Sequence, residues 1–225
     1  MKLIERELGL EIELKENIVS VVIIENVSLR SSIIKEIYSQ SEGEKDGKWL
    51  LVENEKSYDL SKEAQVILEP FSLELNSKKM KTKLYQDIKT ISQDFYFSQS
   101  LELHSDICKY LELLLEKLSY PVKYNEEWNV LEIFKAYGIE LIEECNSMCE
   151  KFYNYIKLVN EICSPKVFVL VNIKQYLTEN EISELYKLAM YSKIQLVLIE
   201  FNMYGKKSEY ENIYIIDKDS CIITY

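Results

Sequence analysis

The stretch Ile18–Ile24 constrains the fold most, because it is apolar, β-branched and followed at once by a helix-forming segment, Ser28–Tyr38. A buried strand that leads directly into a helix is typical of the start of an α/β domain. NTPases of this class place glycines and a lysine between the two elements to bind phosphate. The connection here has no glycine and no Gly-Lys-Ser/Thr. The pattern predicts the layout of an NTPase without its chemistry, which favours a binding protein.

Further strands are predicted at both ends of the chain. Leu3–Leu8 and Glu11–Leu14 alternate apolar with charged residues and predict a hairpin. Lys166–Asn172 and Ile194–Glu200 are again buried strands, and Thr178–Glu181 is a capping box that opens a helix. Shorter strands are expected at Trp49–Glu53, Gln65–Leu68, Asn212–Asp217 and Cys221–Thr224.

The middle of the chain changes to a helical period from about Asn76. Three helices are expected up to Gly138, the third beginning near Glu126, and a fourth follows over Leu141–Ile162. The apolar stripe of this fourth helix suits packing inside the chain or across a subunit interface, and both alternatives stay open. The predicted fold is an α/β head formed by residues 1–75 and 164–225, with a helical leg inserted at residues 76–163.

Composition restricts the compartment and the chemistry. No segment approaches the roughly 18 apolar residues that span a bilayer, and the first residues lack the apolar core of a signal peptide. The five cysteines include no CxxC, and Cys145 and Cys149 share an apolar helical face, so we expect free core thiols and a cytoplasmic protein without membrane contact. A single histidine, His104, argues against a histidine metal site and suits a packing or surface role.

Charge gives opposite indications on DNA binding. The net charge of −11 argues against a general nucleic-acid binder, because phosphate neutralisation dominates such affinity. Locally, however, lysines gather at the predicted start of a helix, where free N–H groups also favour phosphate. We predict DNA contacts from these lysines and from two cations around the first helix; the alternative is a solvated face. The predicted residues are Lys78, Lys79, Lys81, Lys83, Arg30 and Lys35.

An acidic segment lies before and within the third predicted helix, at Glu126, Glu127 and Glu132. Calcium takes several carboxylate and carbonyl oxygens in loose geometry, so these residues are candidate ligands. The spacing is not that of an EF-hand, and a solvated acidic surface is the alternative. Catalytic candidates are poor, since Asn172 and Glu200 end two core strands without a phosphate-binding loop beside them.

The order of these elements resembles the accessory spacer-acquisition proteins of type II-A CRISPR-Cas systems, the Csn2 family. Length and order agree over essentially the whole chain, and the specificity lies in the set of segments rather than in one motif. The matching stretches are Ile18–Tyr38, Gln65–Ile88, Asn129–Lys135, Val167–Asn172, Leu177–Glu181 and Ile194–Glu200.

This resemblance implies a degenerate P-loop-NTPase-like head with a helical leg. It further implies a homotetrameric ring that holds double-stranded DNA at free ends, depends on calcium and has no enzymatic activity. Its implied partners are the CRISPR integrase complex and the effector nuclease. The implied calcium segment falls on Glu126, Glu127 and Glu132, whereas the assignment of the lysines to the DNA channel is our own. A basic lining inside an acidic ring reconciles the net charge with DNA binding.

Two other classes of function remain open at the level of sequence. One is an NTPase or nuclease with an unrecognised site, although the missing loop residues argue against it. The other is a protein-docking scaffold for the adaptation complex, in which the lysines are only solvated and the protein makes no direct DNA contact.

Overall fold

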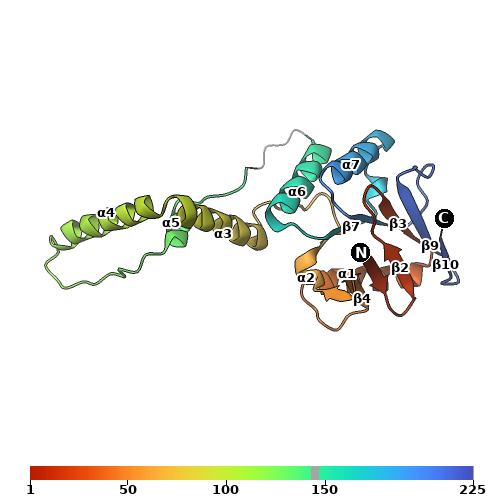
Figure 1. Cartoon of the computed structure of the whole chain (residues 1–225), viewed down its shortest axis with the longest axis horizontal. Helices are drawn as coiled ribbons and strands as arrows, with labels where there is room; N and C mark the ends of the chain where they lie inside the picture. Colours follow the sequence, from red (N-terminus) through yellow and green to blue (C-terminus); the bar gives the residue numbers. More distant parts are fainter. Residues whose placement is uncertain (143–146, 225) are drawn as a thin grey trace. The chain divides into compact units, whose positions relative to one another are not determined.

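The structure, a computed structural model, describes residues 1–142 and 147–224 (Figure 1). Its contacts divide the chain into two compact units. The first unit combines Met1–Glu74 with Glu143–Tyr225, and the second is Leu75–Ile142. The chain is therefore a mixed α/β fold in which both ends build one unit and the middle builds the other.

A six-stranded sheet of order β10-β9-β3-β8-β7-β6 forms the centre of the first unit. The inner neighbours pair in parallel, and only β10 is antiparallel to its neighbour. The predicted buried strands are confirmed, since every residue of β3, β7 and β8 is buried. The strands are β3 Val19–Ile24, β6 Ala64–Ile67, β7 Val167–Val171, β8 Leu196–Glu200, β9 Glu211–Ile216 and β10 Ile222–Thr224.

A smaller antiparallel sheet, of order β2-β1-β4-β5, belongs to the same unit. Its strands are β1 Lys2–Glu5, β2 Leu10–Glu13, β4 Trp49–Glu53 and β5 Lys56–Tyr58. The predicted hairpin is confirmed by the pairing of β1 with β2, whereas β5 and the short helix α2 (Leu60–Glu63) were not predicted. Helix α1, Val27–Ser41, contributes Ile33 and Ile37 to the core that these two sheets share.

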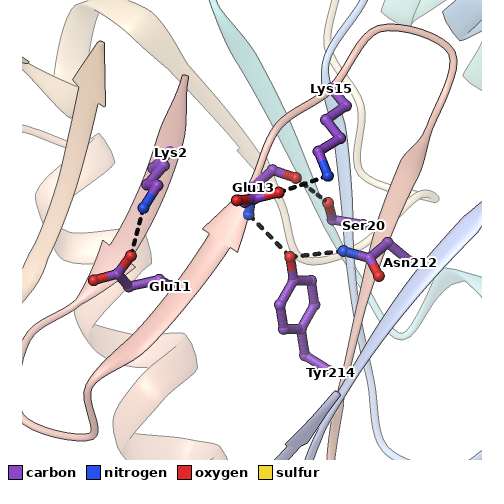
Figure 2. Close-up of polar contacts among 7 residues, drawn as sticks. All are labelled: Lys2, Glu11, Glu13, Lys15, Ser20, Asn212 and Tyr214. Carbon is purple, nitrogen blue, oxygen red and sulfur yellow. Dashed lines mark hydrogen bonds and ion pairs between the residues drawn. The ribbon is translucent and has the colours of Figure 1, made fainter. Parts of the chain in front are cut away.

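Polar contacts also join the two sheets (Figure 2). The backbone N–H of Glu13 in β2 donates to the hydroxyl of Tyr214 in β9 at 3.0 Å, and the Asn212 side-chain amide donates to the same hydroxyl at 2.7 Å. The Ser20 hydroxyl of β3 donates to the Glu13 carbonyl at 3.0 Å. These bonds give partners to buried polar groups and fix the position of β2 against the large sheet.

Helices α6 (Met148–Cys163) and α7 (Glu179–Tyr191) belong to the first unit, with the short 3-10 helix η1 (Ile173–Gln175) after β7. The capping box at Thr178 and Glu181 is confirmed. Our placement of residues 143–163 in the leg differs from this division. Phe152, Ile156 and Val159 of α6 are buried, and the Tyr153 hydroxyl donates to the Glu181 carbonyl. The apolar stripe of α6 is therefore satisfied within the first unit.

The expected long helix over Leu141–Ile162 is also shorter in the structure, because α6 begins only at Met148. The predicted pairing of Cys145 with Cys149 on one helical face lies outside the described residues. Cys149 itself is a free thiol that donates to the Glu181 carboxylate at 2.7 Å, and burial and this glutamate raise its pKa to about 11.

The second unit contains α3 Lys78–Phe95, α4 Phe97–Leu115 and α5 Val130–Ala136. Its two ends are tied together by Asn76, whose side chain accepts from the Leu141 N–H at 2.8 Å and donates to the Leu141 carbonyl at 2.9 Å. Phe134 of α5 is buried and meets the Tyr85 ring of α3 edge-on. In the described part of the chain, we find no helix long and apolar enough to cross a membrane.

Candidate nucleic-acid interface

The first turns of α3 present the predicted lysine cluster. The Ser77 side chain caps this helix by accepting the Met80 N–H, and Met80 is buried. Lys78, Lys79 and Lys83 are exposed. The helix N-terminus adds partial positive charge to theirs, so this end of α3 is suited to phosphate.

The lysines do not form one stripe. Lys79 and Lys83 are four residues apart and share one side of α3, whereas Lys78 and Lys81 lie beyond the buried Met80 face on the other side. Lys81 forms an ion pair with Glu140, so part of its charge is neutralised within the unit. Lys79 and Lys83 are both exposed on one side of the helix, and this side is a candidate for DNA contact.

The N-terminus of α1, where an NTPase would bind phosphate, is closed by the chain itself. The Asn26 side chain accepts the N–H groups of Ser28 and Leu29, at 3.0 and 3.2 Å. The Arg30 guanidinium donates to the Ile24 carbonyl at 3.0 Å and lies 4.4 Å from the centre of the Phe201 ring. Arg30 thus has a structural role, and its DNA contact stays a prediction.

Lys35 is exposed on α1. It lies in the first unit together with Arg30, whereas the lysine cluster lies in the second unit. The structure therefore brings together the four lysines of α3, but it leaves a joint surface with Arg30 and Lys35 as a prediction.

The predicted calcium ligands lie at and before the start of α5. This helix begins at Val130 with Asn129 as its cap, so the expected start near Glu126 was wrong. Glu126 and Glu127 are exposed in the preceding loop, and Glu132 forms an ion pair with Lys135 at 2.8 Å. Across the residues that the structure describes, no group of three or more acidic, histidine or cysteine side chains is placed to hold a metal ion.

Buried polar residues lie on the large sheet, and sequence analysis found only part of them. Glu200 at the end of β8 is fully buried, and burial raises its pKa to about 7. Lys174 forms a buried ion pair with Glu211 at 2.6 Å, and the Tyr186 hydroxyl donates to the same carboxylate. Burial and Glu211 raise the pKa of Tyr186. A cavity of about 500 Å³ borders Lys174, Tyr186 and Glu211.

These groups differ from the phosphate-binding site of an NTPase. Lys174 and Glu211 neutralise each other's charge in an ion pair. Among the described residues, no glycine-rich phosphate loop lies beside Asn172 or Glu200. The sequence pattern did not point to Lys174 or Glu211, because neither belongs to a motif with a characteristic spacing. A charged residue at the first position of a buried strand, as Glu211 is in β9, is the signal that was available.

Helix α4 carries an exposed apolar surface. In the sequence, its apolar pattern looks the same as that of a helix buried in a core. None of its residues is buried, although its apolar residues recur at helical spacing. Four of them form a single exposed stripe, which we call the α4 stripe: Leu103, Ile107, Tyr110 and Leu114. His104 lies beside this stripe with its ring 5.0 Å from the Trp128 ring, as expected of a packing residue.

Comparison with known proteins decides the family. Residues 38–220 match the CRISPR-associated protein family Cas_Csn2. The chain belongs to the Csn2 family. It is 23% identical over 211 residues to the CRISPR-associated protein Csn2 of Streptococcus agalactiae, which covers 91% of this chain and 90% of that protein. The resemblance that the sequence predicted is thus confirmed.

The part of the chain that matches the Csn2 family includes both the lysines of α3 and the acidic segment before α5. Among solved structures, cbiO1 of Clostridium perfringens, part of the ABC transporter complex cbiONQ, matches 92% of this chain and 76% of that chain. This match has a TM-score of 0.47 and 14% sequence identity.

Proposed function

We propose that this Csn2 family member is a non-enzymatic accessory protein of spacer acquisition that binds free ends of double-stranded DNA without reading their sequence. The observation that carries the proposal is the exposed lysine cluster at the N-terminus of α3, in a chain of net charge −11. Lysines on phosphates position a duplex but do not distinguish bases. Such contacts suit a protein that has to accept any invading DNA.

The head is inferred to be a degenerate relative of P-loop NTPases. Support comes from the parallel strand order and from α1, which follows the central strand β3 directly. Asn26 and Arg30 occupy the N-terminus of α1 and the adjoining strand end, where an NTPase would hold phosphate. This arrangement supports a head that serves as a scaffold and does not hydrolyse nucleotides.

Self-association through the α4 stripe is the second part of the proposal. Four large apolar side chains in line on an otherwise unburied helix are unfavourable in water. A second copy of the chain is the occupant that we propose, since the family resemblance implies a homotetrameric ring. In such an assembly the basic face of α3 lines the channel, the acidic residues lie mainly outside, and the integrase complex and effector nuclease are the expected partners.

Calcium is proposed as a cation that supports this assembly. Glu126 and Glu127 would supply carboxylate oxygens, and the described part of one chain leaves the remaining ligands to water or to another copy. The bound charge would weaken repulsion between the acidic surface and phosphate.

Light scattering during size exclusion, with calcium and then with chelator and with a short blunt duplex in each, tests this part. We expect a tetramer in calcium that co-elutes with duplex. Glu126→Gln with Glu127→Gln should raise the calcium concentration needed by at least about tenfold, because each carboxylate contributes a charged ligand. The matched control is Glu16→Gln with Glu25→Gln, which removes the same charge from exposed residues of the first unit.

Equal assembly and duplex binding in chelator would exclude the calcium requirement but leave DNA binding intact. A protein that assembles in calcium yet never co-elutes with duplex would instead favour the docking scaffold, in which the lysines of α3 are only solvated.

A further inference from the structure

Two buried polar residues lie at the carboxyl ends of neighbouring strands: Asn172 directly follows β7, and Glu200 ends β8. Val171 pairs with Ile199 in the parallel register, and the Asn172 N–H donates to the Ile199 carbonyl at 2.7 Å. Asn172 and Glu200 are therefore neighbours across the two strands. Both are at least nine-tenths buried, Asn172 with 8% and Glu200 with 0% of its surface exposed.

Each of these side chains has an oxygen atom without a hydrogen-bond donor. The Oε1 atom of Glu200 accepts from the Lys174 N–H at 3.1 Å, but its Oε2 atom has no partner among the described residues. The Oδ1 atom of Asn172 is also buried without a partner there. Two acceptor oxygens cannot hydrogen-bond to each other unless a hydrogen lies between them.

The charges around Glu200 are also unbalanced. The groups that face it are Lys174 of η1, Glu211 of β9 and Tyr186 of α7. The Lys174 ammonium already pairs with Glu211 at 2.6 Å, and the Tyr186 hydroxyl donates to that carboxylate. One ammonium group faces two buried carboxyls, so an ionised Glu200 would be an uncompensated buried charge.

We propose that Glu200 and Asn172 form a proton-binding site in the head, in which Oε2 of the neutral Glu200 carboxyl donates its hydrogen to Oδ1 of Asn172. The proton comes from solvent, and its binding gives both orphan oxygens a partner and removes the uncompensated charge. Burial, which raises the pKa of Glu200 from 4.5 to about 7, agrees with this assignment. The site makes the stability of the head depend on pH near neutrality, independently of DNA.

The direction of this dependence follows from linkage. The folded pKa of Glu200 lies above the unfolded value, so the stabilisation is complete below about pH 4.5, declines as pH rises and levels off above about pH 7. Between pH 6 and pH 8 the unfolding equilibrium constant of the natural protein should rise by about tenfold from this group.

The test compares urea unfolding of the natural protein and the Glu200→Gln variant from pH 5 to pH 9. The glutamine has the shape of the protonated carboxyl and offers an N–H to Asn172, so the variant should lack the tenfold change between pH 6 and pH 8. Equal pH dependence in the two proteins would overturn the proposal. The proposal also fails if the Asn172 amide donates to an ionised Glu200. In that case the natural protein would lose no stability relative to Glu200→Gln between pH 6 and pH 8.

A second measurement on the natural protein covers the case in which Glu200→Gln does not fold. Carboxyl carbon NMR of ¹³C-glutamate-labelled protein should show one buried glutamate that titrates near pH 7, against about 4.3 for ordinary glutamates. If every glutamate is ionised at pH 5.5, the proposal fails, whatever the protein does with DNA.

Discussion

Charge reversal at Lys79 and Lys83 of α3 is expected to reduce affinity for blunt duplex DNA by at least about tenfold in moderate salt. Both side chains are exposed and lie on one side of the helix, so a duplex along that side would contact both. Each lost phosphate contact should also reduce the slope of log affinity against log salt by about one. Fluorescence anisotropy with a labelled blunt duplex at several salt concentrations measures both quantities.

The substitutions are chosen so that misfolding does not imitate the effect. Glutamate forms helix as readily as lysine, and Lys79→Glu places an acid in the first turn of α3, where the helix dipole favours it. The matched control is Lys206→Glu with Lys207→Glu, which changes net charge equally at exposed residues of the first unit. If both pairs of substitutions weaken binding equally, overall charge and not α3 determines the affinity.

Ile107→Glu with Leu114→Glu should convert the assembly to monomers. Burying a large apolar side chain is worth about 1.5–3 kcal/mol, so two charged replacements in each copy should weaken association by at least about a thousandfold. The two residues are 36% and 48% exposed and no residue of α4 is buried, so the fold should persist. Light scattering during size exclusion gives the mass, and circular dichroism checks the helix content.

Tyr191→Glu with Val27→Glu is the matched control for the α4 stripe. These side chains are 88% and 69% exposed in the first unit, and their replacement should leave the assembly unchanged. An assembly that survives Ile107→Glu with Leu114→Glu would place the subunit interface elsewhere. A natural protein that is monomeric with calcium and DNA would contradict the ring itself.

The head was largely predictable because its strands carry a strong local signal. A β-branched stretch such as Ile18–Ile24 has few ways to be buried except between two layers, and the capping box at Thr178 fixes a helix start by local hydrogen bonds. The strand β5 was missed because it is three residues long and has no fully buried side chain.

The assignment of α6 to the leg failed for a different reason. Helical periodicity reports that a face is apolar, but it does not report which partner covers it. In the structure Phe152 of α6 is buried within the first unit, whereas the equally periodic α4 has no buried residue. The same limit applies to Arg30, since its contact with the Ile24 carbonyl depends on the turn geometry between β3 and α1.

The most direct test of the proposed function compares two forms of one duplex, a blunt linear fragment and the same sequence as a relaxed covalently closed circle. Both are mixed with the natural protein in calcium at low salt and resolved by gel mobility. We predict that the linear form is shifted, that the closed circle is not, and that cutting the circle once restores binding. Equal binding of both forms, or of neither, would contradict a ring that is threaded from DNA ends.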